Sequence, residues 1–399
     1  MRASEQSTAL DTERKSQGHG TDRPQHSESL DLSRPWLSAA VVAWPVLASV
    51  ELKPEQAISL KAFGLPLVLV RGRDGTASAH LDRCPHRQVS FFCASEPPQV
   101  KGNTIRCPFH FQSFDQSGQC VLTLHGEASK GQHLLTLPLL EEQGFLWIPV
   151  SRTLFDQRGH LNLSDQEIEV ARQAIRLPAE FAQLNDRSRI DCLPLYSYRY
   201  PKGPWGLTIT SGIDHTHGFH VHAIARVVHQ LRRWMGQETL SGMHMACDDR
   251  ERSVLVTYSQ YKDTLRAYWK VGGAPNLWLN KLDEGLYIAV LFVPEDSGAT
   301  MTRGWLYLDP LIWGALEFGP ILERLRDLSI HNSEEDRPFI ESQASYVHPG
   351  ELPIGCATTN DAPVYQFFRY LEAITGTPID FGFVKSTAHE LIARNFWSC

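Results

Sequence analysis

The sequence predicts an α+β protein with two domains. The first is all-β, and the second is α+β with a central antiparallel sheet flanked by helices. Residues 57–70 and 76–82 are alternating stretches separated by a Gly-containing turn, which is typical of strands. Further strand-like runs follow between residues 255 and 309, with helical patterns before and after them. A chain of 399 residues also exceeds one typical core.

The first 33 residues are polar, contain several acidic side chains and lack an apolar stretch, which argues against a signal or transit peptide. We expect a disordered tail over residues 1–33, with folded structure beginning at Trp36. The remaining chain is divided into a first domain over 34–152 and a second over 153–399.

Local patterns define the individual elements of the first domain. The runs 57–70 and 76–82 read as strands, and Arg73-Asp74-Gly75 between them is a hairpin signal. The last strand of this domain is expected at 144–150.

The second domain begins with a helix, because Ser164 and Glu167 have the spacing of a capping box. Its strands are expected at 255–261, 266–271, 287–293 and 302–309. Apolar residues recur at helical spacing from Val364 to Ile374, and Gly376 is placed to end that helix.

Composition favours a soluble enzyme. The net charge is −7, 42% of the residues are hydrophobic, and no apolar run reaches the roughly 18 residues that span a bilayer. No nucleic-acid partner and no transmembrane anchor are suggested. Six of the eight cysteines show no paired spacing, so a reducing cytoplasm fits best.

Two Cys–His pairs carry the strongest signal: Cys84-x-His86 and, about twenty residues later, Cys107-x-x-His110. In a Rieske [2Fe–2S] cluster two thiolates hold one iron and two neutral imidazoles hold the other, with reduction potentials of roughly −150 to +300 mV. Each pair mixes one Cys with one His, as expected if each loop gives one ligand to each iron. The alternatives are four unrelated residues or a Cys₂His₂ zinc site, although zinc fingers usually group C-x-x-C before H-x₃₋₅-H.

The surrounding sequence resembles the Rieske family in LDRCPHR, IRCPFHFQSFDQSGQC and LLEEQGFLWIPV, in the order usual for that domain. Rieske proteins of cytochrome bc complexes carry an extra cysteine in each ligand loop, where this chain has Gln88 and Phe109. The resemblance therefore favours the oxygenase or soluble ferredoxin branches. Oxygenases commonly have Gly-Trp after the last His, whereas this chain has Phe111-Gln112, a departure that concerns local packing and reductase contact but not the ligands.

Some 250 residues follow the first domain, more than a ferredoxin needs, and they contain a histidine-rich segment. Its acidic and imidazole residues are Asp214, His215, His217, His220, His222 and His229. Two His and one carboxylate on one face of an iron leave positions open for dioxygen. The resemblance implies D-x₂-H-x₄-H, which Asp214, His217 and His222 fit, although His215 with His220 and His217 with His220 are competing pairs. Histidines five apart converge only where a helix ends or unwinds.

The third iron ligand is expected in NSEEDRPFIESQ, which resembles the family's E-D-x-P-x-x-E-x-Q segment and assigns Asp336. A solvated acidic helix face is the alternative interpretation. Glu335 and Glu341 are fallback ligands, and Asp361 is better explained as a helix N-cap.

The resemblance gives Asp214 another role, that of a bridge between the cluster of one subunit and the catalytic iron of its neighbour. A carboxylate that accepts a hydrogen bond from a histidine on each side would fix both rings. This implies a closed ring of subunits, which in the family is a homotrimer. Many members have Glu-Asn where this chain has Thr210 and Ser211, so details of iron access can differ.

The resemblance covers nearly the whole chain after the tail and is strongest to the monooxygenase branch that includes vanillate demethylase and the methylxanthine N-demethylases. It implies a terminal oxygenase that hydroxylates or demethylates a small, apolar or aromatic substrate with dioxygen. Electrons from NAD(P)H would arrive through a separate ferredoxin or flavin reductase, and the cofactors would be a Rieske [2Fe–2S] cluster and mononuclear Fe(II).

Two other functions remain open. One is an aromatic-ring cis-dihydroxylating dioxygenase, and the other is a Rieske electron-transfer protein without catalytic iron. Product analysis separates the first from a monooxygenase, and the number of irons per chain separates the second.

Overall fold

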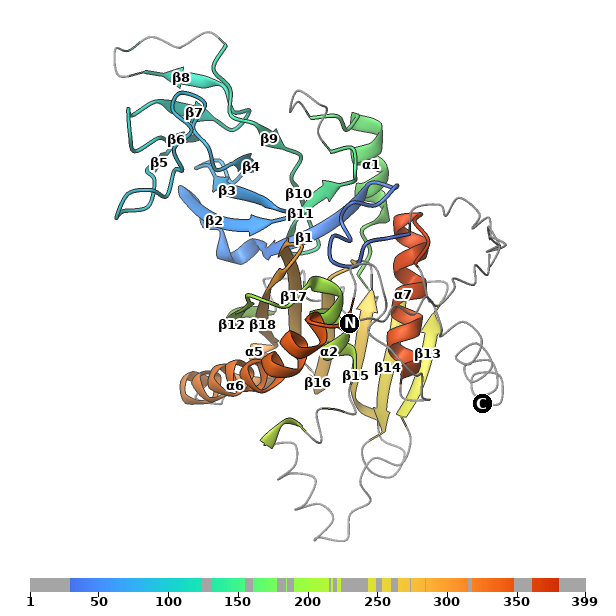
Figure 1. Ribbon diagram of the computed structural model, residues 1–399. Coiled ribbons are helices and arrows are strands. Elements are labelled where there is room, and N and C mark those ends of the chain that lie inside the picture. The colour runs from blue at the N-terminus through green and yellow to red at the C-terminus, as the bar shows by residue number, and fades with distance from the viewer. Residues whose placement is uncertain are drawn as a thin grey trace, which may run out of the picture.

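The structure is a computed structural model, and Figure 1 shows its two domains one above the other. It describes residues 29–123, 126, 131–154, 161–177, 184, 190–214, 217, 221–223, 243–248, 253–259, 265–272, 274–283, 285–314, 318–347 and 361–379.

Three small antiparallel sheets form the first domain, with strand orders β1-β11-β10, β2-β3-β4-β9 and β5-β6-β7-β8. The strands are β1 (Val42–Ala48), β2 (Gln56–Ala62), β3 (Leu65–Arg71), β4 (Ala77–Leu81), β5 (Val100–Lys101), β6 (Thr104–Arg106), β7 (Ser113–Asp115), β8 (Cys120–Leu122), β9 (Thr136–Leu137), β10 (Leu140–Glu142) and β11 (Phe145–Val150). A short 3₁₀ turn, η1 (Ser49–Glu51), follows β1. The predicted all-β first domain is confirmed.

Tight turns set the register of the second sheet. Phe63 and Gly64 join β2 to β3 with φ values of 58° and 78°, as a two-residue hairpin turn of the primed type requires. Gly75, with φ 87°, lies in the turn between β3 and β4, where Arg71 pairs with Ala77. The predicted hairpin around Arg73-Asp74-Gly75 is confirmed.

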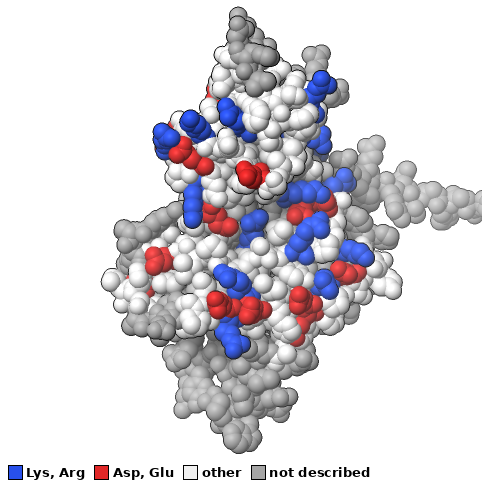
Figure 2. Space-filling model, turned by 90° about the vertical axis from the view of Figure 1, so that its left-hand side faces the viewer, with Lys and Arg blue, Asp and Glu red and all other residues white. Residues whose placement is uncertain are grey.

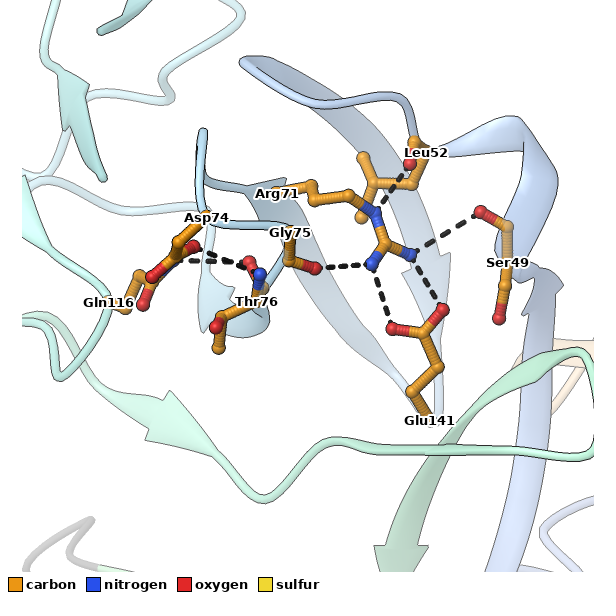
Figure 3. Close-up of polar contacts among 8 residues, drawn as sticks. All are labelled: Ser49, Leu52, Arg71, Asp74, Gly75, Thr76, Gln116 and Glu141. Carbon is orange, nitrogen blue, oxygen red and sulfur yellow. Dashed lines mark hydrogen bonds and ion pairs between the residues drawn. The ribbon is translucent and has the colours of Figure 1, made fainter. Parts of the chain in front are cut away.

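Arg71, the last residue of β3, ties the second sheet to the first (Figure 3). Its guanidinium donates to both carboxylate oxygens of Glu141 on β10, at 2.8 and 3.0 Å. It also donates to the backbone carbonyls of Ser49, Leu52 and Gly75. The Arg71 side chain is only 9% exposed, so its removal would leave buried acceptors without a donor.

We expect Arg71→Met to lower the free energy of unfolding by roughly 1–3 kcal/mol, because it leaves the buried backbone carbonyls bonded by the guanidinium without a donor. Urea unfolding followed by tryptophan fluorescence measures this loss. Arg73→Met is the matched control, since Arg73 is 69% exposed and its surface pair with Glu55 is worth at most about 1 kcal/mol. Equal losses in the two variants would contradict a special contribution from the buried network.

A seven-stranded antiparallel sheet forms the centre of the second domain, in the order β12-β18-β17-β16-β15-β14-β13. The strands are β12 (Asp191–Tyr200), β13 (Met243–Asp248), β14 (Ser253–Ser259), β15 (Leu265–Gly272), β16 (Leu277–Asp283), β17 (Leu286–Asp296) and β18 (Ala299–Leu308). The four predicted strands correspond to β14, β15, β17 and β18, and the other three are additional to them.

Helices pack on this sheet and at its edge. They are α2 (Trp205–Ile213), α5 (Pro310–Trp313), α6 (Phe318–Ala344) and α7 (Ala362–Thr375), whereas α1 (Asp165–Ala174) lies earlier in the chain and contacts β1. Helix α2 contacts β17, α6 and α7, while α6 packs on β12 and α7 on β14 (Figure 1). The predicted capping box at α1 is present, because Ser164 and Glu167 exchange side-chain and backbone hydrogen bonds. Helix α7 ends at Gly376 in the left-handed conformation, as predicted.

One hydrophobic core extends through both domains. Trp44 on β1 packs edge-on against Trp205 of α2, with ring centroids 5.6 Å apart and both side chains fully buried. At the turn after β2, the N–H of Phe63 donates to the carbonyl of Pro294 in β17. These contacts hold the first domain against the sheet of the second.

The last residues of the expected tail over 1–33 pack against the folded chain. Leu30 and Leu32 are 1% and 3% exposed and belong to the shared core. The N–H of Leu30 donates to the carbonyl of Pro378, and the carbonyl of Leu32 accepts from Gly206 at the start of α2. Isolated leucines in a polar segment thus pack against chain that is distant in sequence. Residues 1–28 lie outside the described residues.

The expected division at residues 152 and 153 assigned α1 to the second domain. In the structure α1 contacts β1 of the first domain, and Arg172 near its end pairs with Glu142 of β10. The amide side chain of Gln143 also bonds the backbone of Ile175 and Leu177. Helix α1 therefore attaches to the first domain.

The face of the molecule drawn in Figure 2 carries charges of both signs. Figure 2 shows acidic and basic side chains intermingled on the face turned to the viewer. Among the described residues, no helix is both long and apolar enough to cross a membrane.

Candidate metal centres

The two Cys–His loops have nearly the same backbone geometry. The N–H of Cys84 donates to the carbonyl of Val89, and the N–H of Gln88 donates back to the carbonyl of Cys84, both at 2.8 Å. In the second loop, Cys107 exchanges the corresponding bonds with Gln112 and Phe111, at 2.8 and 3.1 Å. The first loop follows β4 of the sheet β2-β3-β4-β9, and the second loop follows β6 of the sheet β5-β6-β7-β8. These two sheets therefore position the two loops.

The fifth residue of each loop has a positive φ, which is 59° at Gln88 and 56° at Phe111. This left-handed conformation favours glycine and is uncommon for a bulky side chain. Phe111 stands where oxygenases commonly have Gly, so the departure noted in the sequence falls on a position of high backbone constraint. The Phe111 side chain is 48% exposed, with the guanidinium carbon of Arg106 5.7 Å from its ring centroid.

The thiols and the imidazoles form separate pairs. Cys84 and Cys107 are 2% and 1% exposed, and their side chains share a hydrogen bond that raises the pKa of Cys84. The same bond, helped by the backbone N–H groups of Phe109 and His110, lowers the pKa of Cys107 to about 6 although burial opposes it. The rings of His86 and His110 lie edge to face, with centroids 4.6 Å apart.

This arrangement fits a binuclear cluster and not a single zinc ion. In a tetrahedral zinc site all four ligand atoms lie within about 4 Å of one another, given bonds of about 2.0–2.3 Å. Among the described residues, the only set of three or more potential ligands with all atoms within 4.8 Å of one another lies elsewhere, at His217, His222 and Asp336. Two thiols in one place and two imidazoles in another therefore suit two irons.

Gln112 lies at the thiol side of this site. It is 7% exposed, and Sγ of Cys84 donates to its Oε1 at 3.9 Å. When Cys84 is ionised it has no proton to donate, and the amide of Gln112 turned end for end would instead donate its NH₂ group to the sulfur. Hydrogen bonds to the sulfurs are among the factors that set the potential of such clusters.

We expect Gln112→Leu to lower the reduction potential by on the order of tens of millivolts, because the lost bond stabilises the more negative, reduced state. Protein-film voltammetry measures the shift. Gln119→Leu, at an exposed position before β8, should leave the potential unchanged. An unchanged potential in Gln112→Leu would show that this amide does not act on the sulfur.

The second candidate centre lies between the histidine-rich segment and α6. Nε2 of His217 is 3.2 Å and Nε2 of His222 3.6 Å from Oδ1 of Asp336. The two imidazole rings are 5.3 Å apart at an angle of 72°. His222 lies outside the helical geometry of its neighbours Val221 and Ala223, in line with the expected local unwinding.

The Nε2 atoms of His217 and His222 both face Oδ1 of Asp336. Within the described part of the chain, neither ring nitrogen of His217 makes a hydrogen bond, although both are buried. Burial lowers the pKa of His217, but the carboxylates of Asp336 and Asp214 outweigh it and raise that pKa above its ordinary value. A site with this negative field, two imidazoles and a carboxylate fits a divalent metal such as iron.

Neither fallback carboxylate is among the three converging donors. Glu335 accepts from Nδ1 of His222 at 3.1 Å, on the ring edge away from Asp336. Glu341 pairs with Arg337 one turn along α6. His215 and His220, the competing histidines, lie outside the described residues.

Asp214 caps the C-terminus of α2 and is 40% exposed. Its Oδ2 lies 3.8 Å from Nδ1 of His217, longer than a hydrogen bond but on the side of that ring away from Asp336. The hydroxyl of Thr210 donates to the backbone carbonyls of Gly206 and Leu207 within α2.

Residues 43–130 match the protein family described as Rieske [2Fe-2S] domain. The chain carries a Rieske [2Fe–2S] domain. The match includes both ligand loops, so the predicted cluster type agrees with an independent comparison. The predicted cofactor of the Rieske domain is thereby supported.

Curated relatives share mainly this part of the chain. The oxygenase component of dicamba O-demethylase from Stenotrophomonas maltophilia is 36% identical over 108 residues, or 27% of this chain and 31% of that protein. Cholesterol 7-desaturase from Bombyx mori is 29% identical over 198 residues, or 43% of this chain and 42% of that protein. The chain therefore spans between about a third and two fifths of the length of these relatives.

Similarity of the fold covers more of the chain than similarity of the sequence does. The structure of NdmA from Pseudomonas putida CBB5 superposes with a TM-score of 0.59 at 18% identity, covering 87% of this chain and 93% of that one. The Rieske domain and the α+β domain thus occur together in that structure. The predicted fold class is confirmed.

Proposed function

We propose that the chain is a cytoplasmic terminal oxygenase of a Rieske-type system. It would use dioxygen and NAD(P)H-derived electrons to hydroxylate or oxidatively demethylate a small organic substrate. The observation that carries the proposal is the convergence of His217, His222 and Asp336 in a chain that also has a Rieske domain. An electron-transfer protein would need the cluster but not this second set of donors.

The proposed cluster ligands are Cys84, His86, Cys107 and His110, and the proposed iron ligands are His217, His222 and Asp336. When bound, the cluster stores one electron at a time and the mononuclear iron activates dioxygen. The residues of the chain position the cluster and the iron. The thiols are buried while His86 is exposed, so the imidazole side of the cluster site is directed toward solvent or a partner.

The placement of the two centres supports the proposed homotrimer. Figure 1 shows β5 to β8 at the outer end of the Rieske domain, with β1, β10 and β11 between them and the large sheet. A head-to-tail ring would bring the imidazole edge of one subunit to the exposed Asp214 of the next. In this arrangement Asp214 would hold His217 on one side and a cluster histidine of the neighbour on the other.

The names of the relatives guide the choice of substrates. One is named for O-demethylation of dicamba and another for desaturation of cholesterol. We infer an apolar or aromatic substrate for this chain, and a reductase, with or without a ferredoxin, as its redox partner.

The test combines the purified chain, a flavin reductase with ferredoxin, NADH and isotope-labelled dioxygen with panels of aromatic ethers, N-methyl compounds and sterols. The expected result is a product that depends on NADH and dioxygen, with one labelled oxygen atom in a hydroxylated product or formaldehyde from a demethylation. Two labelled atoms in a cis-diol would favour the dioxygenase alternative. Reversible cluster reduction in a chain that binds no third iron would favour the electron-transfer alternative.

A further inference from the structure

Glu335 is placed to control the second metal centre without being one of its three converging donors. Its Oε2 accepts from Nδ1 of His222 at 3.1 Å, and its Oε1 accepts from the backbone N–H of Ala223 at 3.2 Å. The carboxylate therefore accepts hydrogen bonds from both the imidazole and the backbone of the same segment. Its side chain is 19% exposed and that of His222 14%, so water competes little for either contact.

The hydrogen bond between Glu335 and His222 determines the tautomer of His222, that is, which of its two ring nitrogens carries the proton. A carboxylate only accepts hydrogen bonds, so Nδ1 of His222 must carry the proton. In the neutral imidazole, Nε2 then has the lone pair, and it is Nε2 that lies 3.6 Å from Oδ1 of Asp336. Glu335 thus selects the tautomer in which His222 offers its lone pair to the site formed with His217 and Asp336.

Helix geometry explains why the two adjacent carboxylates have different tasks. Successive residues on an α-helix point about 100° apart, so Glu335 and Asp336 of α6 cannot both face the same point. Asp336 faces both Nε2 atoms, while Glu335 reaches the outer edge of His222. His331, one turn earlier on α6, places its Nε2 3.4 Å from Oε1 of Glu335 and braces it from the solvent side.

We propose that Glu335 is a positioning residue that fixes the ring orientation and the tautomer of His222 for metal binding. This inference rests on the proposed function in one respect, namely that His217, His222 and Asp336 hold a metal. Carboxylates that orient a ligating histidine typically affect metal affinity 10- to 100-fold when they are removed.

The test measures metal affinity and not turnover. The protein is freed of exchangeable metal with its cluster retained, and Fe²⁺ is titrated under anaerobic conditions by calorimetry. We expect Glu335→Ala to weaken binding about 10- to 100-fold. Glu335→Gln should weaken it less, because the amide oxygen can still accept from Nδ1 of His222. Glu334→Gln is the matched control, since Glu334 is an exposed carboxylate at the preceding position and should have no effect.

A second readout reports the tautomer directly. Nitrogen NMR of histidine-labelled, metal-free protein, with His222→Gln for assignment, should show His222 protonated at Nδ1 in the wild type and as a mixture in Glu335→Ala. A purely structural role would lower thermal stability without changing this signal. The reduced cluster's electron paramagnetic resonance signal should be the same in all variants that fold, and Glu335→Gln keeps the test available if Glu335→Ala does not fold.

Several outcomes would overturn the positioning role. Unchanged Fe²⁺ affinity in Glu335→Ala would do so. Equal losses of Fe²⁺ affinity in Glu335→Ala and Glu335→Gln would show that only the negative charge of Glu335 matters, and not its hydrogen bond to His222. Loss of binding in Glu335→Gln as complete as in Asp336→Ala would make Glu335 a ligand. Failure of the wild type to bind Fe²⁺ would instead contradict the proposed function itself.

Discussion

Asp336→Ala is expected to abolish product formation and to remove one iron per chain while leaving the Rieske cluster unchanged. The reason is that Asp336 supplies the only carboxylate oxygen facing both Nε2 atoms of His217 and His222 among the described residues. Two imidazoles alone hold a divalent metal much more weakly than the complete set of three donors. Metal analysis of the purified variant, with its visible spectrum as a record of the cluster, measures both effects.

The control for this substitution is Asp327→Ala. Asp327 is an exposed carboxylate on the same helix, so its removal changes the charge of α6 without touching the three donors. It should retain three irons per chain. An Asp336→Ala variant that kept the third iron would show that a different carboxylate completes the site.

Asp214→Ala is expected to keep all three irons but to slow electron passage from cluster to iron by about 10- to 100-fold, the usual scale for loss of a carboxylate that orients a ligand. Asp214 lies 3.8 Å from Nδ1 of His217 and is exposed enough to meet a neighbouring subunit. Single-turnover reoxidation of the reduced cluster in the presence of substrate measures the rate.

Asp214→Asn separates geometry from charge, because the amide keeps one acceptor oxygen for a histidine N–H. It should be less impaired than Asp214→Ala. Normal turnover in Asp214→Ala would rule out the bridging role, whereas loss of the third iron would assign Asp214 to holding the metal.

Local patterns were sufficient for much of the fold. The capping box at Ser164, the turn at Gly75 and the helix stop at Gly376 depend on residues close in sequence, and all three are present. Strand β12 was missed because Pro194 interrupts its pattern. Pro is tolerated there since β12 is at the edge of the sheet, where its pairing with β18 shifts register beside Pro194.

Long-range packing was beyond the reach of these patterns. Leu30 and Leu32 sit in a polar segment, and only the folded chain shows that they meet α2 and the region after α7. In the same way, the acidic run in α6 indicated a carboxylate ligand but not how adjacent side chains divide their roles. The partnership of Glu335 with His222 spans 113 residues, and no local signal reports it.

The most direct test of the two metal centres is the content of iron and acid-labile sulfide per chain in anaerobically purified protein, together with the electron paramagnetic resonance spectrum after dithionite reduction. We expect a Rieske-type signal with about three irons and two sulfides per chain, which is two irons in the cluster and one at the second centre. Two irons with two sulfides would contradict the second centre, and zinc without sulfide would contradict both.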